Sequence, residues 1–196
     1  MLVLGNGESR LGINLNRIND IKVGCNAIYR DYCIDHLVCV DRRMMNEIIL
    51  NCVYKKSKIY TRQDWYKDYQ NYSNVKTVPL LPYKGNKRWD EPFQWGSGPY
   101  AVLIAANFSK GKVNLLGFDL HSKSKNVNNV YKDTRNYDPA SKRAVDPRYW
   151  IHQIGSIFKN FPKINFVIYQ EEDWIMPEQW KYFNVSVDKI SNIYYN

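Results

Sequence analysis

The chain begins with the stretch Met1-Leu2-Val3-Leu4-Gly5-Asn6-Gly7. Its apolar part has the composition of a short buried strand, and the glycines after it mark a sharp turn. In open α/β sheets, ligands bind just beyond the carboxyl ends of the strands. Glycines there let a phosphate or a ribose come close to the backbone. The spacing matches neither G-x-G-x-x-G nor the P-loop, so the turn is either a different ligand-binding turn or an ordinary strand–loop connection.

Short apolar runs alternate with helical segments along the rest of the chain. Strands are expected at 2–4, 21–24, 36–40, 59–61, 112–117 and 165–169, and helices at 44–53, 100–108 and 150–160. This alternation is typical of an α/β fold with a mainly parallel sheet covered by helices. We expect the first strand at the centre of the sheet, and a single domain over residues 1–196. Residues 62–93 are polar, aromatic and proline-containing, which predicts a long connection or insertion.

The net charge of +9 suits an anionic partner, such as a nucleotide, a phosphosugar, nucleic acid or an acidic membrane. Basic residues form small clusters, which are equally typical of a solvated surface. A mean hydropathy of −0.54 and the lack of a long apolar run exclude a transmembrane helix. No basic stretch precedes the first apolar residues, so we expect no signal peptide.

The cysteines indicate a cytoplasmic protein. Cys25, Cys33, Cys39 and Cys52 have no C-x-x-C spacing. We expect them to be reduced thiols in the core rather than zinc ligands.

Polar or glycine residues follow four of the expected strands, and in a parallel sheet these carboxyl ends meet at one edge. The triplet at 96–98, Gly-Ser-Gly, comes before an expected helix, where free N–H groups and the helix dipole favour an anion. Asparagine and aspartate side chains can bond ribose hydroxyls and base edges. The pattern predicts a nucleotide pocket with Asp119 at its edge, formed by Gly5, Asn6, Gly7, Ser9, Asn26, Asp41, Ser97 and Gly98.

The order of these motifs resembles the bacterial CMP-sialic-acid-dependent sialyltransferases. Those enzymes begin with a strand and a G-N-G-P-S turn, continue with R-C-N, open a helix with T-S-G, and end a later strand with G-x-D-F/L. The matching stretches here are Leu2-Val3-Leu4-Gly5-Asn6-Gly7-Glu8-Ser9, Gly24-Cys25-Asn26, Gly96-Ser97-Gly98-Pro99-Tyr100-Ala101 and Leu115-Leu116-Gly117-Phe118-Asp119-Leu120. The resemblance covers residues 1–121 with gaps, and parts of it extend to flagellin-modifying motility accessory proteins and archaeal 6-hydroxymethylpterin pyrophosphokinases.

The resemblance implies a Rossmann-like domain that holds a cytidine or other pyrimidine nucleotide at its strand ends. It implies that Asn6 contacts the donor and that Asn26 reaches its ribose or phosphate. It also implies that Ser97 and Gly98 open the phosphate-binding helix, and that Asp119 helps to place the donor.

Three positions depart from the family's pattern. Glu8 replaces the proline of G-N-G-P-S, Gly96 replaces the threonine of T-S-G, and the family's histidine base falls near Asp146. The nearest histidine to the expected pocket is His121, two residues past Asp119, which we therefore expect to act as a base or to stabilise phosphate. The polar stretch behind it either closes over the phosphate or forms a solvated loop, and its candidate residues are Tyr131, Lys132, Arg135 and Tyr137.

The expected reaction is transfer of a sugar from a CMP-sugar or related nucleotide sugar to a hydroxyl acceptor. The donor is a substrate and no cofactor is required, although Asp41 and Asp119 could hold Mg²⁺ if a diphosphate is bound. Two alternatives stay open: a phosphotransferase like the pterin pyrophosphokinases, or a basic nucleotide- or nucleic-acid-binding protein without catalysis. A nucleic-acid surface would use the aromatic residues that lie among the basic ones, namely Trp65, Tyr66, Tyr69, Tyr72, Tyr83 and Trp89.

Overall fold

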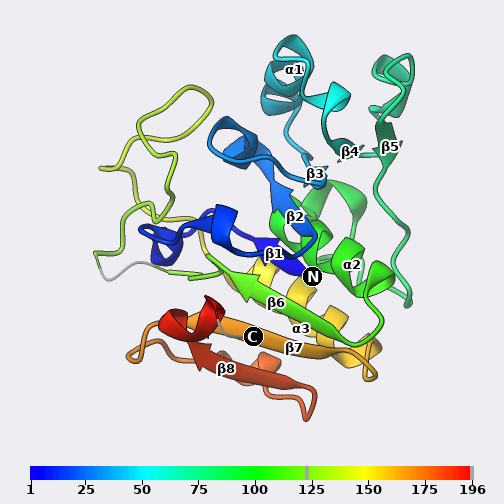
Figure 1. The fold of residues 1–196 in the computed structure, drawn as a ribbon. Coiled ribbons are helices and arrows are strands. Elements are labelled where there is room, and N and C mark those ends of the chain that lie inside the picture. Colours follow the sequence, from blue (N-terminus) through cyan, green and yellow to red (C-terminus); the bar gives the residue numbers. More distant parts are fainter. Residues whose placement is uncertain (122–123, 195–196) are drawn as a thin grey trace.

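A computed structural model describes residues 1–121 and 124–194 (Figure 1). These residues form an eight-stranded sheet in the order β5-β4-β3-β2-β1-β6-β7-β8, with every neighbouring pair parallel. The strands are β1 (Leu2–Leu4), β2 (Lys22–Cys25), β3 (His36–Val38), β4 (Lys58–Thr61), β5 (Val75–Thr77), β6 (Lys112–Leu116), β7 (Asn165–Gln170) and β8 (Val185–Lys189). The expected α/β class is confirmed, and β1 lies inside the sheet.

Helices cover both faces of the sheet. They are α1 (Arg42–Leu50), α2 (Ser97–Phe108) and α3 (Arg148–Asn160). Side chains alternate along β1, so Val3 packs into the core beneath α2 and α3, whereas Leu2 and Leu4 pack into the core that includes α1. Figure 1 shows α2 and α3 behind the sheet. A strand buried on both faces reads as a continuous apolar run, which is why β1 was recognisable from its sequence.

From β1 the chain runs outward through β2, β3, β4 and β5 on one side, and it later returns to add β6, β7 and β8 on the other side. Past the strand ends, the Gly5 N–H donates to Leu116 O at 2.9 Å and the Gly7 N–H donates to Gly117 O at 2.9 Å. A Cβ added to Gly5 would overlap the carbonyl oxygen of Gly117, which itself has a φ of +76°. The glycines therefore allow β1 and β6 to meet closely at the point where the strand order reverses.

Two strands were not predicted. β5 lies within 62–93, where only a connection or insertion was expected, and β8 follows the 3-10 turn Glu178–Trp180. β5 has only three residues, and β8 is an edge strand whose side chains are mostly exposed. Neither offers the apolar run that marks the inner strands. Within the described residues, no helix is long and apolar enough to cross a membrane.

The expectation of four core thiols was wrong for two of them. Cys25 and Cys39 are buried at strand ends, but Cys33 and Cys52 are exposed, and all four are free. Cys33 lies in the turn before β3. Cys52 follows α1 in a left-handed conformation with a φ of 55°. Both the buried and the exposed cysteines have apolar neighbours in the sequence, so these neighbours did not show which thiols are buried.

Candidate functional site

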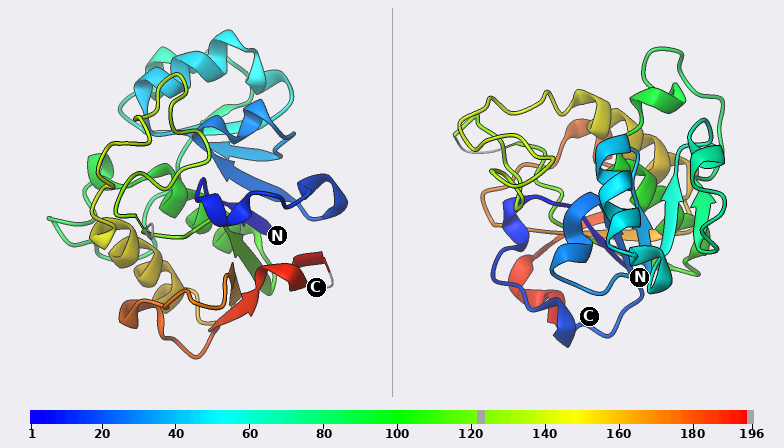
Figure 2. Two further views of the ribbon diagram at one scale, coloured as in Figure 1. Left: turned by 90° about the vertical axis from the view of Figure 1, so that its left-hand side faces the viewer. Right: turned by 90° about the horizontal axis from the view of Figure 1, so that it is seen from above.

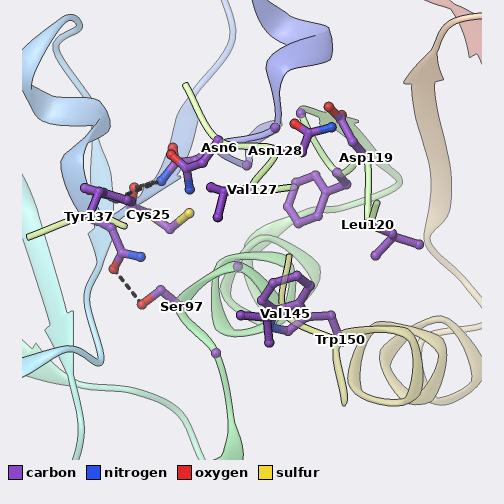
Figure 3. Close-up of a pocket in the computed structure, with 18 of the residues that line it drawn as sticks. Asn6, Cys25, Ser97, Asp119, Leu120, Val127, Asn128, Tyr137, Val145 and Trp150 are labelled. Carbon is purple, nitrogen blue, oxygen red and sulfur yellow. Dashed lines mark hydrogen bonds between the residues drawn. The ribbon is translucent and has the colours of Figure 1, made fainter. Parts of the chain in front are cut away.

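A cavity of about 490 Å³ opens at the carboxyl ends of β1, β2, β3 and β6 (Figure 3). The first turn of α2, the start of α3 and residues 124–147, here called the cover loop, complete its walls. The cover loop runs across this edge of the sheet (Figure 2, left). The predicted residues that line the cavity are Gly5, Asn6, Gly7, Asn26, Asp41, Ser97, Gly98, Asp119 and His121. Ser9 and Tyr131 are not among the lining residues.

Asn6 has an unused hydrogen-bond acceptor. Its side chain is buried, with 9% of the residue exposed. Nδ2 donates to Cys25 O at 3.2 Å and to the hydroxyl of Tyr137 at 3.3 Å, whereas Oδ1 has no partner among the described residues. The Cys25 carbonyl can only accept, which fixes the amide with its N–H₂ group on that side. A buried acceptor without a partner is unfavourable, so this oxygen is suited to an N–H or O–H group of a ligand.

Asn26 and Ser97 hold three elements together. Asn26 has a φ of 54°, and its Oδ1 accepts from Ser97 Oγ at 2.7 Å. Ser97 Oγ in turn accepts from the Val40 N–H at 3.0 Å. The two side chains thus join the end of β2, the end of β3 and the start of α2. Oδ1 of Asn26 and Oγ of Ser97 are therefore engaged in hydrogen bonds within the protein.

The start of α2 faces the cavity with free backbone donors. Its N-cap is Gly96, which has no side chain to accept from the first turn, and no acidic side chain lies in that turn. The first bond of the helix runs from the Tyr100 N–H to Gly96 O at 3.2 Å. The N–H groups of Ser97 and Gly98 precede it and have no intrahelical acceptor. Together with the helix dipole they favour an anion.

Asp119 anchors the turn that follows β1. Its carboxylate accepts from the Ser9 N–H at 2.9 Å and from Ser9 Oγ, and Gln170 Nε2 lies 3.4 Å from Oδ1. A Cβ added to Gly7 would lie 2.5 Å from Cγ of Asp119. Ser9 does not line the cavity, so it can affect the site only through its hydrogen bonds to Asp119. Asp119 in turn mainly holds the glycine turn after β1 in position.

Asp41 caps α1, because its Oδ1 accepts from the Met44 N–H at 2.9 Å. It lines the cavity beside Arg43, whose guanidinium lies 4.0 Å from Oδ2. Over residues 1–121 and 124–194, no three His, Cys, Asp or Glu side chains are grouped so as to hold a metal ion. Asp41 and Asp119 each line the cavity while already holding a backbone N–H group.

His121 lies exposed at the cavity mouth. Its carbonyl accepts from Asn128 Nδ2 at 2.9 Å, and Asn128 Oδ1 accepts from the Glu8 N–H at 2.7 Å. The backbone of His121 is thus tied to both the cover loop and the turn after β1. Asp146, near the position expected for the family's histidine, does not line the cavity and instead pairs with Arg148 at 2.6 Å.

Two tyrosines of the cover loop have different environments. Tyr131 is buried, where its hydroxyl donates to Asp31 at 2.7 Å and accepts from Arg10 at 3.0 Å. Tyr137 lines the cavity, and its hydroxyl accepts from Asn6 and from the Ala27 N–H, each at 3.3 Å. Burial raises the pKa of Tyr137 far above its ordinary value, so the phenol keeps its proton at neutral pH. With two donors on its oxygen, that proton is available to a ligand.

A partly buried ion pair holds the cover loop in place. Arg30 Nη2 lies 2.6 Å from Glu47 Oε1, and Glu47 Oε2 accepts from Asn136 Nδ2 at 2.7 Å. Arg30 also donates to Thr134 Oγ1 and to the Arg135 carbonyl, each at 2.9 Å. Burial alone would raise the pKa of Glu47, but hydrogen bonds from Tyr29 and Arg30 and the charge of Arg30 lower it below its usual range. These partners are far apart in sequence and carry no local signal.

No protein-family model, curated protein or solved structure matches this chain. The argument about function therefore depends on the cavity itself. Sequence analysis found the strand-end and α2 residues because they directly follow or precede apolar elements. It named Tyr137 only as one of several loop residues that could close over a phosphate, and it missed Trp150, which reaches the cavity from the first turn of α3.

Proposed function

We propose that the cavity binds a nucleotide, and that the protein transfers a sugar from a CMP-sugar or related nucleotide sugar to a hydroxyl acceptor. One observation carries the proposal: the cavity is lined both by Asn6, whose buried Oδ1 has no partner among the described residues, and by the start of α2, where the first N–H groups are free. The oxygen can accept a hydrogen bond from a donor, such as a ribose hydroxyl or a base amine. The N–H groups can donate to an anion, such as a phosphate. A nucleotide carries both groups in one molecule.

The place and size of the cavity support this ligand. The cavity lies where the strand order reverses between β1 and β6, which is the preferred ligand position in open α/β sheets. Its volume of about 490 Å³ is within the range of small-molecule sites. The overall charge of +9 favours the approach of an anionic ligand.

The motifs that resemble the sialyltransferases favour a CMP-sugar as the donor. In the proposed reaction, the bond between the anomeric carbon and the phosphate oxygen breaks, and the acceptor oxygen bonds to that carbon. The acceptor's proton passes to His121, and the nucleoside monophosphate CMP leaves with the bonding electrons. The N–H groups of α2 and the hydroxyl of Tyr137 would stabilise the charge on the leaving phosphate. Asp119 and Tyr131 act as positioning residues, because both are hydrogen-bonded within the protein.

The cysteines bear on where such a transferase would work. All four are free, and Cys33 and Cys52 are exposed. Because exposed thiols stay reduced in the cytoplasm, we place the protein there.

Thermal unfolding with a panel of CMP, CDP, UMP and their sugars tests the binding step. A ligand at 100 times its dissociation constant should stabilise the protein by about 2.7 kcal/mol. We expect the largest shift from a cytidine nucleotide. If no member of the panel raises the melting temperature, the proposal is wrong.

The reaction step is tested by His121→Ala. We expect turnover of the donor to fall by about 10²- to 10⁴-fold while nucleotide affinity stays nearly unchanged. His36→Gln is the matched control, because His36 opens β3 at its amino end and bonds Tyr60 at 3.0 Å. Full activity of His121→Ala would remove this residue from the reaction.

A further inference from the structure

The ring of Trp150 lies against Gly96, the N-cap residue of α2. In many helices the N-cap residue has a side chain that caps the first turn. Trp150 belongs to the first turn of α3 and lines the cavity. A Cβ added to Gly96 would lie 3.0 Å from Nε1 of Trp150 and 3.3 Å from its Cδ1. The N–H edge of the indole therefore rests against the backbone of Gly96, in the space that a larger residue would fill.

The indole N–H of Trp150 has no acceptor among the described residues, unlike those of three other tryptophans. Trp95 donates to Asp90 at 3.2 Å, Trp174 to a backbone carbonyl at 3.1 Å, and Trp180 to a backbone carbonyl at 2.9 Å. An indole N–H can only donate. In Figure 3, Trp150 and Asn6 lie on opposite sides of the cavity, with Ser97 at its edge.

We propose that Trp150 is a phosphate-binding residue, whose Nε1–H donates to the same anion as the backbone N–H groups of Ser97 and Gly98. This inference rests on the proposed function, because it assigns the phosphate of the bound nucleotide to the start of α2. A second, independent observation comes from Asn6, which lines the same cavity, is nine-tenths buried, and has an Oδ1 without a partner among the described residues. The proposal also explains Gly96, since any side chain there would crowd the indole.

The effect should appear only with ligands that carry a phosphate. A hydrogen bond to a charged group contributes enough that its loss weakens binding by about ten- to one-hundredfold. Trp150→Phe keeps an aromatic ring and removes the N–H. We therefore expect this variant to lose about ten- to one-hundredfold in affinity for CMP, and none for cytidine.

Two further variants separate the N–H from general packing. Gly96→Ala leaves Trp150 intact but places a methyl group 3.0 Å from Nε1, so it should weaken CMP binding selectively as well. Trp89→Phe is the matched control, because Trp89 packs on Tyr149 with ring centroids 4.5 Å apart and does not line the cavity. It should bind CMP like the unmodified protein.

The deciding measurement is the indole N–H signal of Trp150 in ¹H–¹⁵N spectra, identified by its loss in Trp150→Phe. It should shift on titration with CMP and with inorganic phosphate, and stay in place with cytidine. If CMP binds equally well to the unmodified protein and to Trp150→Phe, the inference is wrong and the proposed function stands. If CMP does not bind at all, the proposed function is wrong. In that case, a shift with inorganic phosphate alone would still support Trp150 as an anion donor, and no shift would overturn it.

Discussion

The two walls of the cavity are held by different kinds of interaction. The strand wall consists of the ends of β1, β2, β3 and β6 with the start of α2, and backbone hydrogen bonds join β1 to β6 directly past the strand ends. The cover loop has no helix or strand and is held largely by side chains, above all Arg30, Glu47 and Tyr137. The first wall follows from the topology of the sheet, whereas the second depends on individual residues.

The groups with unused bonding capacity lie mainly on the strand wall. They are Oδ1 of Asn6 and the N–H groups of α2. The cover loop contributes the hydroxyl of Tyr137, which accepts from Nδ2 of Asn6 and from the Ala27 N–H and so keeps its own proton for a ligand. Changes that break the backbone packing of the strand wall should therefore cost more stability than changes that break the side-chain contacts of the cover loop.

Gly5→Ala should have the largest effect, because it breaks the strand wall. The added Cβ would overlap the carbonyl oxygen of Gly117, and both backbones are fixed by the sheet. We expect the free energy of unfolding to fall by about 3 kcal/mol or more, measured by urea denaturation. Gly111→Ala is the control, because no atom lies within 4 Å of a Cβ added there. Equal stability of the two variants would show that β1 and β6 do not need this close approach.

Glu47→Gln should loosen the cover loop and leave the strand wall intact. The change removes the charge that Arg30 faces, and it places an amide group beside the donors Tyr29 and Asn136. Because Arg30 is partly exposed, we expect a loss of about 2 kcal/mol, less than for a fully buried pair. Asp138→Asn, which breaks the exposed pair with Lys142 in the same loop, should change stability by less than about 0.5 kcal/mol. Similar losses of stability in both variants would contradict the view that the pair of Arg30 and Glu47 holds the cover loop in place.

The pair of Arg30 and Glu47 should also make stability depend on pH. The pKa of Glu47 is lowered in the folded protein, so the unfolded chain takes up the proton first as the pH falls. The stabilisation from Glu47 is thus complete above its unfolded pKa of about 4.3 and is lost as the pH falls through the folded pKa. The difference in unfolding free energy between the unmodified protein and Glu47→Gln should shrink below about pH 4.3. A difference that is constant from pH 7 to pH 3 would contradict this account.

The difference between the strand wall and the cover loop also explains which residues could be predicted from the sequence. Asn6, Ser97 and Gly98 were found because each lies next to a buried element whose apolar run is plain in the sequence. β8 was missed because an exposed edge strand has no such run. Trp150 comes to the cavity from a helix that starts far along the chain, and only the packing of α3 on α2 brings it there.

The cover loop shows most clearly what could not be predicted from the sequence. Tyr131 and Tyr137 are six residues apart in one polar stretch, yet Tyr131 is buried and bonds Arg10 and Asp31, whereas Tyr137 lines the cavity. Nothing in the local sequence separates them, because their partners come from the segments that follow β1 and β2. The chemical role of His121 stays a prediction that rests on its place at the mouth.

Calorimetric titration of CMP into the unmodified protein, Asn6→Ala and Asn114→Ala tests the central claim most directly. Both asparagines are buried with an unpartnered Oδ1, but only Asn6 lines the cavity. We expect the unmodified protein and Asn114→Ala to bind CMP alike, and Asn6→Ala to bind about tenfold more weakly, as for the loss of one hydrogen bond. The absence of CMP binding by the unmodified protein, or equal affinity of Asn6→Ala, would contradict the claim that this cavity is a nucleotide site.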